Sequence, residues 1–309
     1  MDSQKPASFF RAGRFQFEIG KRTWVIGILN VTPDSFSDGG QFTELSRAVA
    51  RAMEMKQQGA DWIDIGGEST RPGSAAVPAS VEIDRIVPIV AQLARTLDVP
   101  LSIDTFKSEV ADAALSAGAS IINDVTGLIG DPKMAEVAAR HGAGLVLMHN
   151  AVLYRRGQPA ADVFTNLPEL PVVLRSVFDS IDLLAAVRHY LLLGCQRALE
   201  AGIKPDQLVL DPGIGFGLTT GESLELIDRL GEIQCLPGRR LPVLSGPSRK
   251  RFIGELLGLP PEDRAIGTAA AVAASIARGA DFVRVHDVAE VAQTARICDA
   301  ILRRKGIGS

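Results

Sequence analysis

The segment Gln58-Gly59-Ala60-Asp61-Trp62-Ile63-Asp64-Ile65-Gly66-Gly67 contains the structural unit from which most of this chain is built. Its first glycine closes a helical segment, because the residue just past a helix end often needs a positive φ. The short apolar run Trp62–Ile65 follows. Continuous apolar runs that are separated by helices are typical of parallel strands buried on both faces. The segment therefore predicts a helix end followed by one strand of a parallel sheet.

The same unit recurs along almost the whole chain. Glycine again precedes the apolar run in Ala117-Gly118-Ala119 and in Arg278-Gly279-Ala280-Asp281. Eight such units favour a single-domain α/β fold, the (β/α)8 TIM barrel, over an open doubly wound sheet, which usually has fewer strands. The expected strands are Trp24–Leu29, Trp62–Ile65, Pro100–Ile103, Ser120–Asn123, Gly144–Met148, Leu208–Leu210, Pro242–Ser245 and Asp281–Val285.

Two regions lie outside the eight units. Phe15–Val25, with Gly20-Lys21 at its middle, predicts a hairpin that closes the barrel floor. We expect residues 1–13 to be disordered or extended and the barrel domain to occupy residues 14–309. Between the fifth and sixth strands, Asn150–Pro171 is expected to be a loop and Val172–Gly202 to form one or two helices.

Composition indicates a folded cytoplasmic protein. Of the 309 residues, 46% are hydrophobic and 22% are charged, which allows a large buried core. The formal net charge of −3 gives no general attraction to nucleic acid or to an anionic membrane, so local cations must hold any anionic substrate. Cys195, Cys235 and Cys298 form no CxxC pair, as expected of reduced cysteines. Residues 1–13 lack the apolar run of a signal peptide, and no stretch reaches the roughly 20 apolar residues of a membrane helix.

Polar residues lie at the carboxyl end of every expected strand. In a TIM barrel these ends form the mouth in which active sites lie. Packing alone does not explain such a repeated pattern, so the sequence predicts an active site at the barrel mouth. The second strand contains Asp64 and runs into Glu68-Ser69-Thr70-Arg71. The other strand-end groups are Asn30, Asp104-Thr105, Asn123-Asp124, His149-Asn150, Asp211-Pro212-Gly213, Ser248-Arg249-Lys250 and Arg284-Val285-His286.

Each group also has a purely structural interpretation. Asp104 could cap a helix, and a single histidine such as His149 is more often structural than catalytic. The segment Asp211–Gly217 is rich in glycine, but it lacks the GxGxxG spacing of a dinucleotide-binding loop. His149, His189 and His286 lack metal-ligand spacing, which argues against a zinc site.

Taken together, these motifs resemble the dihydropteroate synthase family of pterin-binding enzymes. The family is known to fold as a (β/α)8 barrel, in agreement with the strand pattern. The resemblance implies a folate-biosynthesis transferase that condenses 6-hydroxymethyl-7,8-dihydropterin diphosphate with p-aminobenzoate. The matching segments occur in family order, and they are Gly27–Gly40, Asp64–Gly73, Ser102–Lys107, Ile121–Val125, Asp211–Gly217, Ser248–Gly254 and Arg284–Val288.

The resemblance places a pterin at the barrel mouth. A pterin presents adjacent N–H donors along one edge, and a carboxylate accepts two parallel hydrogen bonds from such an edge. Asp211 matches the family residue that does so, while Asn123 and Asp104 match those that contact other ring atoms. Lys250 matches the residue beside the ring carbonyl. The implied pterin-binding residues are Asp104, Asn123, Met148, Asp211, Phe216 and Lys250.

The resemblance also implies a site for the leaving diphosphate and a magnesium ion. Arg284 and His286 alternate along one strand end, so both side chains can face one pocket. Mg²⁺ keeps several waters and uses few protein ligands besides phosphate oxygens, which suits Asn30 as its protein ligand. The implied diphosphate-binding residues are Asn30, Thr70, Arg71, Arg284 and His286.

The implied reaction is a substitution at the exocyclic methylene of the pterin. The electron-rich dihydropterin can stabilise a cation there, so we expect the C–O bond to break before the amine attacks. The aryl amine is neutral at physiological pH and needs no strong base, which explains why no nucleophile–His–carboxylate triad is evident. The implied catalytic residues are Lys250, Asp104, Arg284 and His286, and the implied p-aminobenzoate-binding residues are Phe36, Thr70, Pro72 and Ser248.

Some positions depart from the family pattern. Met148–Tyr154 lies in a variable segment, and the resemblance gives no role to Arg155 or Arg156, which follow it. Leu218 stands where many members have lysine, and Pro247 stands at a variable position before the acceptor pocket.

Two alternative functions remain open at this point. A methyltetrahydrofolate-binding methyltransferase barrel also recognises a pterin, but it does not need the diphosphate-binding residues. A non-catalytic paralogue would bind a pterin without making product, and the presence of Asn30, Lys250 and Arg284 argues against it. We expect small-molecule substrates, Mg²⁺ as cofactor, no nucleic-acid or membrane partner, and a homodimer.

Overall fold

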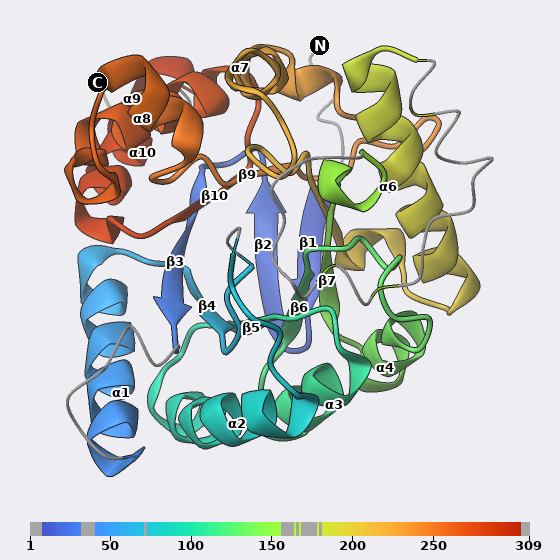
Figure 1. Ribbon diagram of the computed structural model, residues 1–309, viewed down its shortest axis with the longest axis vertical. Helices are drawn as coiled ribbons and strands as arrows, with labels where there is room; N and C mark the ends of the chain where they lie inside the picture. Colours follow the sequence, from blue (N-terminus) through green and yellow to red (C-terminus); the bar gives the residue numbers. More distant parts are fainter. Residues whose placement is uncertain are drawn as a thin grey trace, which may run out of the picture.

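A ring of helices surrounds a barrel of parallel strands in the computed structural model, which describes residues 8–31, 41–70, 73–155, 164, 167, 178 and 181–303 (Figure 1). Within these residues, eight strands form one sheet in the order β8-β7-β6-β5-β4-β3-β10-β9, and every neighbouring pair is parallel. A bridge between Leu210 and Val243 joins the two ends of the sheet, and Leu210 N–H donates to the Pro242 carbonyl oxygen at 2.9 Å. The predicted (β/α)8 barrel is thus confirmed.

The strands lie within a residue or two of their predicted positions. The main difference is at Pro242–Ser245, where the strand is only Leu244–Ser245. Pro242 has no N–H to give to a neighbouring strand, and Val243 N–H donates to the Asp281 carboxylate instead. The barrel strands are β3 (Trp24–Asn30), β4 (Trp62–Gly66), β5 (Leu101–Asp104), β6 (Ile121–Asp124), β7 (Gly144–Met148), β8 (Leu208–Asp211), β9 (Leu244–Ser245) and β10 (Phe282–Val285).

Helices follow the strands and cover the outside of the barrel. Gly59, just after the first helix, has a φ of +108°, as predicted for a glycine that closes a helix. No helix in the described part of the chain combines the length and the apolar character that crossing a bilayer requires. The α-helices are α1 (Gln41–Gln58), α2 (Ala79–Thr96), α3 (Ser108–Ser116), α4 (Met134–His141), α6 (Leu183–Glu200), α7 (Thr220–Asp228), α8 (Arg251–Leu257), α9 (Ala265–Ala277) and α10 (Val288–Leu302).

An N-terminal hairpin closes the barrel floor, but it begins earlier in the chain than predicted. Its strands are β1 (Ser8–Ala12) and β2 (Phe15–Ile19), which pair antiparallel. The turn lies at Gly13, whose φ is +55°, and not at Gly20-Lys21, which connects β2 to the barrel. Residues 8–12 are thus an extended strand within the N-terminal segment that precedes residue 14.

Aromatic packing holds this hairpin against the floor. Phe10 and Phe17 point inward and pack with Trp62 and Phe282, which are the first residues of β4 and β10. The Phe10 and Phe282 rings meet edge to face, with centroids 5.7 Å apart. Because the hairpin seals the amino ends of the strands, the open end of the barrel is the carboxyl end.

The long segment between β7 and β8 contains one described helix, α6, which lies inside the predicted range Val172–Gly202. Asp182 caps it by accepting a hydrogen bond from Ala185 N–H at 3.0 Å. Short 3₁₀ turns occur at η2 (Ala151–Leu153), η4 (Pro205–Gln207), η5 (Leu230–Glu232) and η6 (Pro261–Asp263).

Candidate active site

The polar residues that were predicted at strand ends converge on the barrel mouth. Asp104, the last residue of β5, pairs in register with Asn123 of β6. Met148, the last residue of β7, pairs with Asp211, the last residue of β8. Neighbouring strands thus bring these four residues to the carboxyl end of the barrel, where TIM-barrel active sites lie.

Arg284 of β10 is the cation at the centre of this mouth. Its Nε donates to Asp64 Oδ2 at 2.5 Å, and its Nη2 donates to Asp104 Oδ2 at 2.5 Å. The side chain is 19% exposed, so it is largely buried at the mouth. Two carboxylates therefore hold the guanidinium in a fixed orientation at the mouth.

Asp64 is a site residue to which sequence reasoning gave no role. It is completely buried, and besides Arg284 it accepts hydrogen bonds from the Ser102 hydroxyl and from Asn123 Nδ2, the latter at 3.2 Å. The sequence indicates its importance in one way: Asp64 lies in the middle of an apolar strand, and a buried carboxylate needs hydrogen-bonding or charged partners. Asp64 links Arg284 to Asn123 and so fixes two of the predicted residues relative to each other.

The carboxyl groups of Asp104 and Asp211 have unusually high pKa values. Burial raises the pKa of Asp104 to about 7, although the neighbouring Arg284 opposes this rise. Burial also raises the pKa of Asp211 to about 6, against a hydrogen bond from Gly213 N–H at 2.8 Å and the charges of Lys250 and Arg284. Perturbed carboxyl groups that are gathered at a barrel mouth are typical of functional sites.

An apolar wall borders Asp211. Met148 belongs to a small cluster that contains Phe106 and Val125, and Phe216 packs against that cluster. The Lys250 ammonium lies 4.0 Å from the centre of the Phe216 ring, which is the geometry of a cation–π contact. Met148, Phe216 and Lys250, all predicted for the pterin site, thus lie close together.

Ser248 and His286 meet on the β9–β10 side of the mouth. The Ser248 hydroxyl lies 3.0 Å from His286 Nδ1, and His286 N–H donates to the same hydroxyl at 3.2 Å. The structure therefore brings together one residue predicted for p-aminobenzoate and one predicted for diphosphate. Arg249 turns away and pairs with Asp287 at 2.5 Å, which fixes the loop beneath Ser248.

Asn30 is the last residue of β3 and pairs in register with Gly66, the last residue of β4. A Cβ atom at Gly66 would lie 3.8 Å from Asn30 Oδ1 and 3.6 Å from Asp104 Cβ, so any side chain there would narrow the gap between them. Thr70 is half-buried in the loop after β4. The predicted site residues Phe36, Arg71 and Pro72, together with Arg156, lie outside the described residues.

His149 has a structural place in the barrel. It is completely buried, and burial lowers its pKa to about 4, so the ring is neutral. Its Nδ1 lies 3.0 Å from the Pro212 carbonyl oxygen, which can only accept, so Nδ1 carries the hydrogen. Nε2 then accepts from the Tyr154 hydroxyl at 2.7 Å. His149 connects β7 to the segment that follows Asp211.

Two residues to which the family resemblance gave no clear role, Arg155 and Leu218, also contact their neighbours in the structure. Arg155 Nη2 lies 2.8 Å from a carboxylate oxygen of Glu222 in α7, and Arg155 Nη1 donates to the Gly217 carbonyl oxygen at 3.3 Å. Leu218 is 3% exposed and packs in the main core. Arg155 and Leu218 therefore hold the segment between β8 and α7 in place against the segment after β7 and the core.

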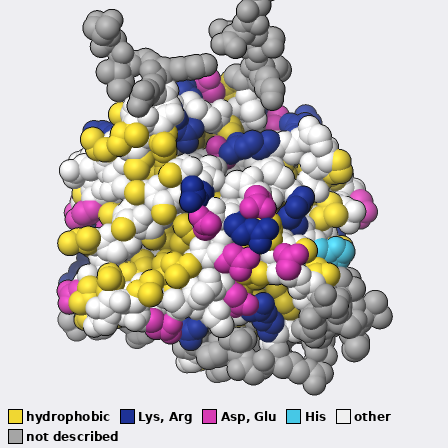
Figure 2. All heavy atoms as spheres, turned by 90° about the horizontal axis from the view of Figure 1, so that it is seen from above, with side chains coloured by type: hydrophobic (Ala, Val, Ile, Leu, Met, Phe, Trp, Pro, Cys, Tyr) yellow, Lys and Arg dark blue, Asp and Glu magenta, His cyan; other side chains and the backbone are white. Residues whose placement is uncertain are grey.

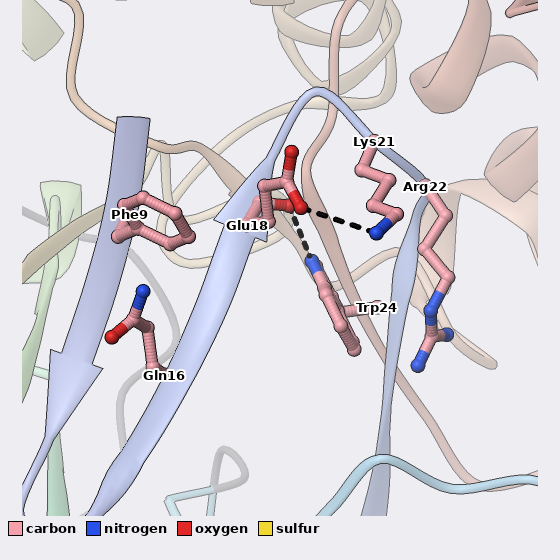
Figure 3. Close-up of a pocket in the computed structure, with 6 residues that line it drawn as sticks. All are labelled: Phe9, Gln16, Glu18, Lys21, Arg22 and Trp24. Carbon is pink, nitrogen blue, oxygen red and sulfur yellow. Dashed lines mark hydrogen bonds and ion pairs between the residues drawn. The ribbon is translucent and has the colours of Figure 1, made fainter. Parts of the chain in front are cut away.

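A surface pocket at the hairpin is separate from this site. Figure 3 shows the residues that line it, among them Glu18, Lys21, Arg22 and Trp24. Lys21 pairs with Glu18 at 3.2 Å, and the Arg22 guanidinium lies 3.7 Å from the Trp24 ring centre (Figure 3). Trp24 begins β3, so the pocket lies at the floor and contains none of the predicted site residues.

Comparison with known proteins connects this geometry to one family. Residues 26–286 match the family of pterin-binding enzymes. The chain is 45% identical to the dihydropteroate synthase of Bacillus subtilis, over 93% of this chain and 91% of that protein. It is 44% identical to the dihydropteroate synthase of a Synechocystis strain, over 94% of each.

Solved structures agree with the sequence comparison. A structure of Xanthomonas albilineans dihydropteroate synthase with 4-aminobenzoic acid has a TM-score of 0.82 and 38% identity, covering 96% of this chain and 98% of that one. The same enzyme in complex with 7,8-dihydropteroate has a TM-score of 0.78 and 37% identity, covering 95% and 98%. The chain therefore belongs to the pterin-binding enzyme family and, within it, to the dihydropteroate synthases.

Proposed function

We propose that this chain joins 6-hydroxymethyl-7,8-dihydropterin diphosphate to p-aminobenzoate and releases 7,8-dihydropteroate and diphosphate. Family membership supports the overall reaction, and related structures are named for complexes with 4-aminobenzoic acid and with 7,8-dihydropteroate. The observation that carries the proposal for this chain is the buried carboxylate of Asp211, beside Met148 and Lys250 at the barrel mouth.

Asp211 is proposed to bind the amide–amidine edge of the pterin. Ionised, it is an acceptor for two N–H donors, and its 6% exposure keeps competing water away. Asn123 and Asp104 would contact other ring atoms, and Lys250 would donate to the ring carbonyl. Met148 and Phe216 would cover the apolar faces of the ring.

The diphosphate is proposed to lie toward Asn30, Arg284 and His286, with Thr70 and Arg71 from the loop after β4. Arg284 keeps a positive charge there because its contacts with Asp64 and Asp104 raise its pKa still further, despite burial. Positive charge beside the departing oxygens stabilises the transition state of C–O cleavage.

The Asn30 side chain also fits a magnesium ligand. Its amide oxygen lies at the end of β3, beside Gly66 at the barrel mouth, and oxygen donors are what Mg²⁺ prefers. Among the described residues, no group of three or more His, Cys, Asp or Glu side chains is arranged to hold a metal. Asn30 would therefore be one of few protein ligands, and bound Mg²⁺ would neutralise charge on the diphosphate.

Catalysis is proposed to depend on holding and orienting both substrates. Lys250 and Asp104 would hold the ring while positive charge develops at the methylene, and Arg284 and His286 would stabilise the departing anion. The amine of p-aminobenzoate then forms the C–N bond with its own lone pair, and the resulting ammonium releases a proton to solvent. Phe36, Thr70, Pro72 and Ser248 would hold this acceptor, with its carboxylate near the start of α8.

Assembly and location are further parts of the proposal. Exposed apolar side chains on neighbouring helices support a homodimer: Leu256 on α8, Ile266 on α9, and Ile297 and Ile301 on α10. Ile266 is 86% exposed, and Figure 2 shows hydrophobic side chains gathered on the side of the molecule where these helices lie. Sedimentation velocity tests the dimer. The proposed compartment is the cytoplasm.

A coupled diphosphate-release assay tests the function. Diphosphate should appear when both substrates and Mg²⁺ are present, and should fall to background when p-aminobenzoate is omitted under steady-state conditions. Pterin binding without diphosphate release would favour a non-catalytic paralogue. Methyl transfer from methyltetrahydrofolate would favour the methyltransferase alternative.

A further inference from the structure

A buried ion cluster closes the base of the loop between β4 and α2. The Lys107 ammonium donates to Glu68 Oε2 at 2.9 Å, to Glu82 Oε2 at 2.8 Å and to the Val77 carbonyl oxygen at 2.6 Å. Val77 N–H donates to the other carboxylate oxygen of Glu68 at 2.5 Å. Glu68 and Val77 lie at the two ends of the loop, so the cluster holds these ends together.

The cluster also fixes the loop to the wall of the barrel. Glu82 lies in the first turn of α2, and Lys107 directly precedes α3. Arg85, also in α2, donates to the Gly67 carbonyl oxygen at 2.8 Å. The loop base is therefore attached to two helices, and its position depends on Lys107, which joins them.

Lys107 has no hydrogen-bonding capacity left for a substrate. An ammonium has three N–H donors, and its three acceptors here account for all of them. The Lys107 side chain is 18% exposed, while those of Glu68 and Glu82 are 4% and 0% exposed. Any effect of Lys107 on the reaction must therefore pass through the groups that it holds.

The charges in the cluster do not balance, so the cluster is not well suited to stabilising the fold. One ammonium serves two buried carboxyl groups, and Glu82 Oε1 has no hydrogen-bond partner within the described part of the chain. Burial raises the pKa of Glu82, against the neighbouring Lys107. Buried ion pairs often stabilise a fold no better than apolar packing of the same volume does. Their directional bonds do fix geometry, and fixed geometry is what a substrate-binding loop needs.

We infer that Lys107 is a positioning residue for the p-aminobenzoate pocket, acting through the loop that Glu68 and Val77 close. The inference rests on the proposed function, in which Thr70 of this loop contacts p-aminobenzoate. Asp211, Asn123 and Lys250 lie on other strands and loops. Asp104 ends β5 only three residues before Lys107, but its carboxylate is held by Arg284 and not by the cluster. The pterin pocket should therefore depend on this cluster much less than the p-aminobenzoate pocket does.

Two variants test the inference. Lys107→Met removes the ammonium and retains most of the side-chain volume. Glu68→Gln is the milder change, because it leaves the Lys107–Glu82 pair intact and weakens only the attachment of the loop. Each should raise the KM for p-aminobenzoate, by about tenfold or more in Lys107→Met, since small displacements of positioning groups have large kinetic effects. The affinity for 6-hydroxymethylpterin, measured by calorimetry, should stay within about twofold of wild type.

Arg240→Met is the matched control. Arg240 pairs with Asp281 at 2.8 Å, and the Asp281 side chain is 2% exposed and lies just before β10, at the barrel floor. This variant should lower the Tm as Lys107→Met does, yet leave both KM values unchanged. If Lys107→Met fails to fold, Glu68→Gln decides the question.

An unchanged KM for p-aminobenzoate in Glu68→Gln would overturn the inference. So would an equal loss of pterin and p-aminobenzoate affinity, or the same kinetic change in Arg240→Met, since either indicates general destabilisation. If wild-type protein forms no dihydropteroate, the proposed function fails instead, whatever the variants do.

Discussion

Arg284 and Asp64 form an ion pair inside the barrel mouth, with Nε and Oδ2 2.5 Å apart, although they are 220 positions apart in the chain. The Asp64 side chain is 1% exposed. A charge at this depth is tolerated because Arg284 neutralises it while Ser102 and Asn123 donate hydrogen bonds to it. Arg284 is therefore a structural counter-ion as well as the cation that is proposed to face the diphosphate.

Arg284→Ala should consequently reduce both turnover and stability. Turnover should fall by orders of magnitude, and the free energy of unfolding should fall by about 3–5 kcal/mol because Asp64 and Asp104 lose their counter-ion. Urea denaturation measures the second effect. Adding Asp64→Asn to Arg284→Ala should restore part of the stability without restoring turnover.

Arg278→Ala is the control for this experiment. Arg278 pairs with Asp228 at 2.7 Å, but both side chains are more than half exposed. Its loss should cost less than about 1 kcal/mol. Equal destabilisation by the two alanine substitutions would mean that Arg284 does not neutralise buried charge.

Asp211 should make the stability of the protein depend on pH. Its pKa of about 6 lies above the ordinary value of 3.8, so the folded state binds a proton that the unfolded chain releases between these values. The free energy of unfolding should therefore fall as the pH rises from about 3.8 to about 6, and the whole cost of burying the ionised Asp211 is present above about pH 6. Asp211→Asn removes the titration, so its stability relative to wild type should be about 1–2 kcal/mol higher at pH 8 than at pH 5. Chemical denaturation at the two pH values measures this, and an equal difference at both would show that Asp211 titrates normally.

Binding of the two substrates should be ordered. The loops that carry Phe36 and Pro72 are rich in Gly and Ser, and Asn30 and Arg71 lie in or beside them. Mg²⁺–diphosphate would draw these loops over the mouth and complete the acceptor pocket. Calorimetric titration should therefore detect p-aminobenzoate binding only after pterin and Mg²⁺–diphosphate have been added. Equal affinity with and without diphosphate would indicate a preformed pocket.

The fold was predictable because its determinants are local. Each barrel strand is a short apolar run after a helix end, as in Trp62–Gly66 after Gly59, and this pattern repeats along the chain. The hairpin was misplaced because its position depends on contacts made by Phe10 and Phe17 inside the barrel floor. Such long-range packing leaves little trace in neighbouring residues.

The candidate site was predictable at strand ends but not in its pairings. The barrel topology and the family resemblance together placed Asp104, Asn123 and Asp211 at one mouth, and the structure brings them there. Asp64 contacts side chains from three other strands, those of Ser102, Asn123 and Arg284. The Lys107 cluster joins a loop to residues in or next to two helices. These partners are far apart in sequence, and a single sequence does not reveal their pairing.

The most direct test is the affinity of a diphosphate-free pterin for wild type and for Asp211→Asn. An asparagine offers one acceptor and opposes the second pterin N–H with its own donor, which should cost about 2–4 kcal/mol of binding free energy. Asp281→Asn is the control, because Asp281 is also a buried carboxylate but lies at the barrel floor, where Arg240 and Val243 N–H donate to it. Calorimetry with 6-hydroxymethylpterin should show wild-type affinity in Asp281→Asn and a loss of about 30-fold or more in Asp211→Asn. Undiminished pterin affinity in Asp211→Asn would contradict the assignment of this site to the pterin.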